Sequence, residues 1–383
     1  MRAATRLDYL DGWRVAAILM VFADHLGMNH AIGAFYEKSP FGVIAQYGET
    51  GVFIFFFISG YVVSLGCLGE AAQTGDFSAR AFYLRRFFRI VPPLMLYLST
   101  LLALGLSGVI DFGWDNFWSA ALYLCNSTAP GVSCNWYVGH TWSLAFEAQF
   151  YFLFPATFAW LALGRAPRLL ALAPAIAFAA IPFVFTIWWI GKIGCLVAYA
   201  LFFLGFMAAK HGEAFWRAFG GWRMTGLLAA SAIVFMPRSI VASFGADEAA
   251  RGELIAWFRL LFIGAVPMVV LLSGASGSLT CRLLSNGVVA FLGRASYSVY
   301  LWQQLCAGPV FNDLDVAPQL ALLGAVVLFC VMMFPLEQRL VGFGRVMSER
   351  LERKGSETSS PHLAPQPAGW RPGGAAAGTP LSE

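Results

Sequence analysis

About ten long apolar stretches constrain what this chain can fold into. They cover approximately residues 12–28, 43–65, 87–109, 143–163, 169–190, 193–209, 224–242, 254–273, 288–306 and 317–337. A helix needs roughly 20 apolar residues to cross a hydrocarbon core of about 30 Å. Of the 383 residues, 59% are hydrophobic and only 12% are charged, whereas about a quarter are charged in soluble domains. The sequence therefore predicts an all-α polytopic membrane protein with about ten transmembrane helices.

The basic residues predict how these helices are oriented. When the N-terminus is placed in the cytoplasm, most of the 25 Lys and Arg residues fall in predicted cytoplasmic loops. Only Lys38, Lys192, Arg238 and Arg251 fall in the loops on the other side. Because cytoplasmic loops carry an excess of basic residues, we expect both termini to be cytoplasmic. The orientation of the helices accounts for the positions of the Lys and Arg residues, so we expect no binding of nucleic acid.

Two segments are not expected to span the membrane. Gly113–Cys125 is apolar and aromatic, but counting it as a further span would invert every later loop, so we interpret it as re-entrant or interfacial. Residues 1–345 are expected to form the membrane domain. Residues 346–383 are rich in Ser, Pro, Gly and Ala, a composition that favours a disordered cytoplasmic tail.

The seven cysteines do not form a metal-binding pattern, because no pair has the spacing of a zinc site. We therefore predict no metal. Cys125 and Cys134 fall in one predicted external loop, where a disulfide is chemically possible in an oxidising compartment. Two unrelated small residues would explain this pair equally well.

Three ionisable residues lie inside or at the start of predicted spans, where a charge costs several kcal/mol and suggests a function. Arg14 and His25 are eleven residues apart, so they share a helical face and are separated by about 16 Å. Their alternative roles are interfacial anchoring for Arg14 and helix packing for His25. Glu147 has Tyr151 one turn later on the same face, and its alternative role is a structural ion pair.

A cluster of arginines opens the third span from the cytoplasmic side. Arg86 and Arg89 are three residues apart, so they share a helical face and offer a forked cationic site for phosphate. Such residues also determine topology and bind anionic lipid headgroups. Both interpretations remain open from composition alone.

Five stretches in the same order resemble the acyltransferase-3 family of membrane O-acyltransferases. They are Leu7–Arg14 with His25, Gly51–Gly60 (GVFIFFFISG), Arg85–Pro92 (RRFFRIVP), His140–Tyr151 (HTWSLAFEAQFY) and Leu292–Trp302 (LGRASYSVYLW). The resemblance covers residues 7 to about 340, and His140–Tyr151 is its most specific stretch. The chain has Phe53 where the family often has an acidic residue and Gln303 where it often has His.

The resemblance implies transfer of an acyl group, typically acetyl, from cytoplasmic acyl-CoA to a hydroxyl, often on a cell-envelope glycan. It also implies a bacterial inner-membrane location and no permanently bound cofactor. His25 would deprotonate the acceptor hydroxyl, and Glu147 would orient His25 or stabilise its imidazolium. A covalent acyl intermediate on His25 or Ser143 is the alternative.

The remaining expected site residues form two groups. The coenzyme A phosphates are expected to contact Arg14, Arg85, Arg86 and Arg89, and the substrate is expected to contact His140, Trp142, Ser143 and Tyr151. The alternative function is a transporter or flippase for a glycan or anionic substrate, because buried charges also line permeation paths. The identity of the acceptor, the acyl chain length and the oligomeric state are not encoded visibly.

Overall fold

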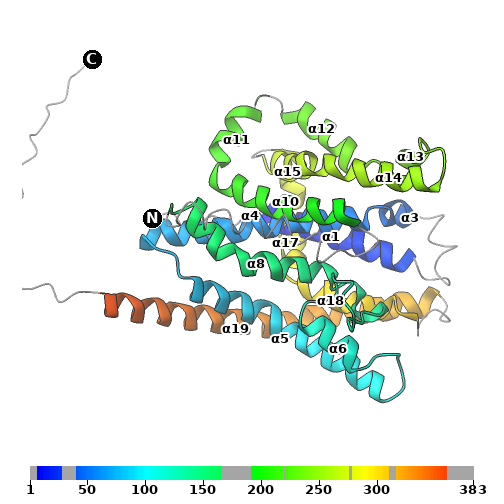
Figure 1. Cartoon of the computed structure of the whole chain (residues 1–383), viewed down its shortest axis with the longest axis horizontal. Helices are drawn as coiled ribbons and strands as arrows, with labels where there is room; N and C mark the ends of the chain where they lie inside the picture. The colour runs from blue at the N-terminus through cyan, green and yellow to red at the C-terminus, as the bar shows by residue number, and fades with distance from the viewer. Residues whose placement is uncertain are drawn as a thin grey trace, which may run out of the picture.

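The protein is a bundle of helices that lie mostly along one long axis (Figure 1). The computed structural model describes residues 7–27, 40–164, 191–219, 221, 223–275, 278–309 and 316–359, and these contain no β-strand. The helices are α1 (Asp8–Gly27), α3 (Pro40–Ala45), α4 (Gly48–Thr74), α5 (Ala79–Leu106), α6 (Trp114–Ala121), α7 (Trp136–Gly139), α8 (Trp142–Leu161), α10 (Gly191–Lys210), α11 (Gly212–Phe219), α12 (Arg223–Val234), α13 (Arg238–Ala242), α14 (Glu248–Phe258), the 3₁₀ turn η2 (Arg259–Leu261), α15 (Phe262–Ser273), α16 (Leu279–Leu284), α17 (Gly287–Arg294), α18 (Ser296–Cys306) and α19 (Val316–Ser359).

Five helical segments in the described part of the chain are long and apolar enough to cross a membrane. They are α4, α5, α10, Glu248–Ser273 and Gly324–Arg350. Helices α1 and α8 have 20 residues each, but they contain the charged and polar residues discussed below. The expected span at 169–190 lies outside the described residues. The all-α membrane class is confirmed, and the number of ten spans and the cytoplasmic termini stay predictions.

Several expected spans are divided into shorter helices. The span expected at 224–242 consists of α12 and α13, with Pro237 between them. Proline lacks the amide N–H that a continuing helix would use. The span expected at 254–273 contains the 3₁₀ turn η2, and the span at 288–306 is divided between α17 and α18 at Ala295. These interruptions could not be seen in the hydropathy pattern.

The aromatic segment Gly113–Cys125 does not span the bundle. Its helix α6 has eight residues, which corresponds to about 12 Å, and Trp114, Trp118 and Leu122 are exposed. Figure 1 shows α6 beside α5 at the outer edge of the bundle. This helix is too short to cross a membrane, and its interfacial position stays a prediction.

A disulfide joins Cys125 to Cys134 in the loop that follows α6. The loop is also held by Asn116, whose side-chain amide donates to both the carbonyl and the hydroxyl of Ser133. At the other end of the chain, α19 continues to Ser359, so it passes through residue 346, the expected start of the tail. Residues 360–383 lie outside the described residues.

Glycines allow the central helices to approach closely. On α4, Gly60 lies so near α10 that a Cβ atom at this position would overlap the carbonyl oxygen of Phe202. On α10, a Cβ atom at Gly205 would lie 2.5 Å from the carbonyl oxygen of Phe57. Small residues at helix crossings are the usual way for membrane helices to pack, because lipid provides little hydrophobic driving force between helices.

We predict that Gly60→Ala destabilises the protein by about 1–3 kcal/mol, because the added methyl group must displace backbone of α10. The matched control is Gly66→Ala on the same helix, where an added Cβ meets nothing within 4 Å. This control should leave stability unchanged or raise it by up to about 1 kcal/mol through helix propensity. Thermal unfolding in detergent measures both changes, and equal midpoints for the two variants would contradict the close crossing.

Candidate active site

Helices α1, α4, α5, α8 and α18 surround one cavity, and each of them contributes residues from one of the five stretches singled out in the sequence. The cavity measures about 840 Å³ including its opening. Its lining consists of Arg14, Val52, Phe55, Phe56, Ser59, Val62, Val63, Arg86, Arg89, Ile90, Ser143, Leu144, Glu147, Tyr151, Ser296, Tyr297 and Tyr300.

Three arginines give one part of the cavity a positive charge. Arg14 forms an ion pair with Asp11, at 2.8 Å between Nη1 and Oδ1. The guanidinium of Arg86 lies over the ring of Tyr151, 5.3 Å from its centroid. Arg89 lines the cavity beside them, and Arg86 and Arg89 share a helical face as their spacing predicted. Guanidinium groups in such an arrangement suit phosphate or carboxylate.

Glu147 supplies the carboxylate of the cavity wall. Its Oε1 accepts a hydrogen bond from the hydroxyl of Ser59 at 2.8 Å and another from the phenol of Tyr151 at 2.5 Å. Hydrogen bonds to an ionised acceptor are stronger than those between neutral groups. Glu147 therefore fixes α4 and α8 to each other at the level of the arginines.

The far end of the cavity is closed by a hydroxyl pair and apolar side chains. The Ser143 hydroxyl and the Tyr300 phenol lie 2.6 Å apart. Both hydroxyl groups also reach the carbonyl oxygen of His140, the phenol at 2.6 Å and the Ser143 hydroxyl at 3.4 Å. Val52 and Phe55 line the adjacent wall. Two hydroxyl groups are thus placed at an otherwise apolar end.

His25 lies outside the cavity, beyond this closed end. Its Nδ1 is 3.0 Å from Oε1 of Gln303, and its ring lies edge-on to Trp136 with centroids 6.2 Å apart. Gln303 follows Tyr300 by three residues on α18, a rise of about 4.5 Å along the helix. About one helical turn therefore separates the end of the cavity from His25.

The expected contact between His25 and Glu147 is not formed among the described residues. Glu147 is bonded to Ser59 and Tyr151, and His25 is bonded to Gln303. The two residues lie on either side of the Ser143–Tyr300 closure. Periodicity gives the helix face on which each residue lies, but it cannot give the relative heights of two helices.

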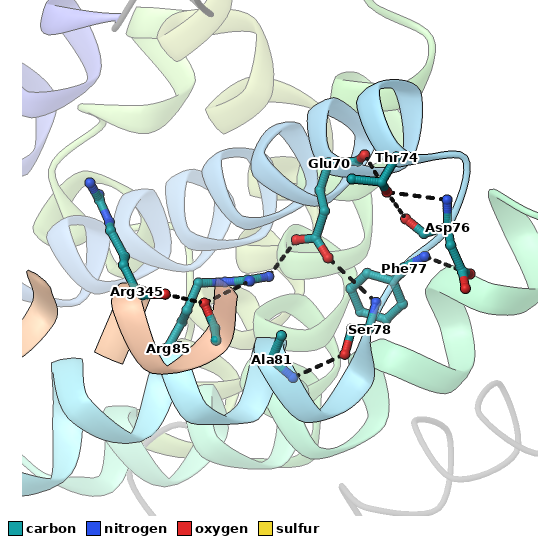
Figure 2. A network of polar contacts seen from close by, with 9 residues as sticks. Glu70, Thr74, Asp76, Phe77, Ser78, Ala81, Arg85 and Arg345 are labelled. Carbon is teal, nitrogen blue, oxygen red and sulfur yellow. Dashed lines mark hydrogen bonds and ion pairs between the residues drawn. The ribbon is translucent and has the colours of Figure 1, made fainter. Parts of the chain in front are cut away.

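Arg85 is the expected phosphate-binding residue that the structure does not place in the cavity. Figure 2 shows its side chain pointing to Glu70 near the end of α4, with 2.5 Å between Nη2 and Oε2. Arg85 also donates to the hydroxyl of Ser348 on α19 at 3.4 Å. Adjacent helix positions differ by about 100°, so Arg85 cannot share the face of Arg86. Through its contacts with Glu70 and Ser348, Arg85 instead joins α5 to α4 and α19.

Two of the four expected substrate contacts line the cavity, namely Ser143 and Tyr151. Trp142 is packed against the rings of Phe56 and Phe146 in the core. The ring of His140 packs against Tyr97 and Tyr300, and its backbone carbonyl belongs to the closed end. These two residues shape the site without lining the cavity.

Sequence reasoning gave no role to Ser59, Tyr297 or Tyr300, which line the cavity, or to Gln303, which contacts His25. All four lie in or directly after the stretches quoted above, so position within these stretches was the available signal. No group of His, Cys, Asp and Glu suited to a metal ion occurs in the part of the chain that the structure describes.

Comparison with known proteins agrees with the resemblance of the stretches. A family model described as an acyltransferase domain, that of the acyltransferase-3 family, matches residues 7–336. A Staphylococcus aureus (strain COL) protein named "Putative O-acetyltransferase" is 25% identical over 331 residues, which cover 76% of this chain and 49% of that protein. O-acetyltransferase OatA of Staphylococcus aureus (strain NCTC 8325) is 27% identical over 173 residues, or 42% of this chain and 26% of OatA.

The chain spans about half the length of the first of these relatives. No solved structure matches the chain.

Proposed function

We propose that this chain, which belongs to the acyltransferase-3 family of membrane O-acyltransferases, transfers an acyl group from an acyl-CoA thioester to a hydroxyl acceptor. The observation that carries the proposal is one cavity with arginines at one end and hydroxyl groups at the other. The names of the relatives support acetyl as the acyl group.

The arginines suit the donor. Coenzyme A carries phosphate groups at its nucleotide end, and Arg14, Arg86 and Arg89 form the only arginine cluster that lines the cavity in the described part of the chain. The pantetheine arm would extend along α4, which lines the cavity from Val63 to Val52. Eleven helical residues correspond to about 16 Å. The thioester would then lie near Ser143 and Tyr300.

The reaction needs one base and a site for the developing oxyanion. His25 accepts the proton of the acceptor hydroxyl while the hydroxyl oxygen attacks the thioester carbonyl. The hydroxyl groups of Ser143 and Tyr300 stabilise the negative charge on the carbonyl oxygen. The carbon–sulfur bond then breaks, the imidazolium returns its proton to the thiolate, and the products are free coenzyme A and the ester. Because His25 lies beyond the closed end of the cavity, the Ser143–Tyr300 pair must separate before the reactants meet.

The location of the two substrates follows from the proposed topology. The arginine end would face the cytoplasm of a bacterial inner membrane, where acyl-CoA is made, with both termini on the same side. The disulfide between Cys125 and Cys134 supports an oxidising compartment on the opposite side. A hydroxyl of a cell-envelope glycan is the acceptor that we propose on that side.

The direct test uses the purified full chain in liposomes with radiolabelled acetyl-CoA and a panel of envelope glycans. Transfer of label to a glycan, with release of one coenzyme A per ester formed, is the expected result. Movement of a glycan or anion across the liposome membrane without release of coenzyme A would favour the transporter or flippase instead.

We predict that the double variant Arg86→Ala with Arg89→Ala raises KM for acyl-CoA roughly 100-fold or more, because each lost contact with a charged phosphate removes about 1.5–3 kcal/mol. KM for the acceptor should change little. Arg85→Ala is the matched control, since Arg85 bonds Glu70 outside the cavity, and it should leave the donor KM unchanged. An equal donor KM in wild-type and folded double variant would limit these arginines to a topological role.

We predict that His25→Ala lowers kcat by roughly 10²–10⁴-fold, because the general base is lost. Glu147→Gln keeps the shape of the side chain and removes the charge that bonds Ser59 and Tyr151. The two losses should multiply in the double variant, because the structure forms no contact between these residues. Steady-state kinetics on monodisperse preparations of the two single variants and the double variant gives the kcat values to compare. A double variant no worse than His25→Ala alone would show that the residues act as one unit.

A further inference from the structure

Two consecutive glutamines on α18 have no role in the preceding proposal: Gln303 contacts His25, and Gln304 contacts Gln303. Gln303 is 1% exposed and Gln304 is 3% exposed. A buried amide group is costly unless its donor and acceptor are both hydrogen-bonded. The partners of these two amides therefore determine which way each amide group points.

Trp136 determines how the side-chain amide of Gln304 is oriented. It lies on the helix α7, which follows the disulfide-bonded loop. Its backbone carbonyl can only accept, and Nε2 of Gln304 donates to it at 2.9 Å. The Trp136 indole N–H in turn donates to the backbone carbonyl of Gln304 at 3.2 Å. This reciprocal pair fixes the amide of Gln304 with its oxygen on the side of Gln303.

The oxygen of Gln304 then sets the amide of Gln303. Nε2 of Gln303 donates to Oε1 of Gln304 at 3.5 Å, which leaves Oε1 of Gln303 as an acceptor beside His25. This Oε1 lies 3.0 Å from Nδ1 of His25. Nε2 of Gln303 is also close to Nδ1, at 2.8 Å, but a bond from it would leave the buried Oε1 without a donor.

We infer that Gln303 and Gln304 form an amide relay that keeps the proton of His25 on Nδ1 and leaves the lone pair of Nε2 for the proton of the acceptor hydroxyl. The inference rests on the proposed role of His25 as base, and it makes both glutamines positioning residues. Trp136 contributes by holding the relay at its origin and by packing its ring edge-on against the imidazole. Which nitrogen carries the proton in a neutral histidine is set by the bond that the other makes.

The tautomer of His25 can be measured without any activity. Solid-state NMR of the full chain in liposomes, labelled with ¹⁵N-histidine, resolves protonated from unprotonated ring nitrogens, and His25→Asn assigns the His25 signals among the five histidines. At a pH where the ring is neutral, we expect a proton on Nδ1 in wild type and in Gln303→Glu, which still offers an acceptor. Gln303→Leu should lose this preference.

The matched control is Gln149→Leu. Gln149 is an amide within the apolar helix α8 that bonds Asn126 and Tyr199 and does not contact His25. This variant removes a similar network at another place, so it should leave the His25 signals as in wild type. A change in Gln149→Leu equal to that in Gln303→Leu would show that the tautomer responds to general loosening and would overturn the relay.

Kinetics supply the second measurement. Gln303→Leu should lower kcat roughly 10–100-fold, as loss of a partner that orients a functional histidine typically does, and should leave KM for acyl-CoA unchanged. Gln303→Glu should restore part of kcat. Its carboxylate oxygen can accept the Nδ1 proton of His25 in place of Oε1 of Gln303.

The outcomes separate the relay from the proposed function. A proton on Nδ1 in wild type that is lost in Gln303→Leu supports the relay even if no acyl transfer is found, in which case only the proposed function fails. A proton on Nε2 in wild type, or a folded Gln303→Leu with the tautomer and kcat of wild type, overturns the relay.

Discussion

The cost of holding charged side chains inside an apolar bundle is the constraint on which the rest of this structure depends. Arg14 is paired with Asp11 one turn earlier, and Glu147 accepts two hydroxyl hydrogen bonds. The Asp11–Arg14 pair lies within α1, whereas the bond from Ser59 to Glu147 joins α4 to α8. Gly60, the residue after Ser59, lets another side of the same helix approach α10 closely.

The all-α membrane class was predictable from the sequence, because apolar length depends only on composition and bilayer thickness. The interruptions at Ala295 and at η2 were not predictable, because a broken helix keeps the same hydropathy as a continuous one. In the site, helical phase correctly placed Arg86 and Arg89 on one face. The same argument should have excluded Arg85, whose position differs by about 100° from that of Arg86.

The expected pairing of His25 with Glu147, which the structure does not form, shows what a single sequence cannot predict. Each residue was identified because an ionisable group in a span is expensive, and this argument is independent of the fold. Which groups meet depends on the relative heights and rotations of α1 and α8, which no local pattern contains. The true neighbour of His25 is Gln303, a neutral residue that a search for charges could not detect.

The structure thus divides the polar residues into two sets with separate supports. Around the cavity, Arg14 is paired with Asp11 and Glu147 accepts hydrogen bonds from two hydroxyl groups. His25 instead contacts the neutral amide of Gln303, beyond the Ser143–Tyr300 pair. In the proposed mechanism a neutral environment suits His25 as base, because a nearby carboxylate would stabilise the protonated imidazolium. A charged environment would suit the proposed polyanionic donor. The Ser143–Tyr300 pair between them would keep the phosphate charges of that donor away from the base, so that each end could bind its own substrate before the pair separates.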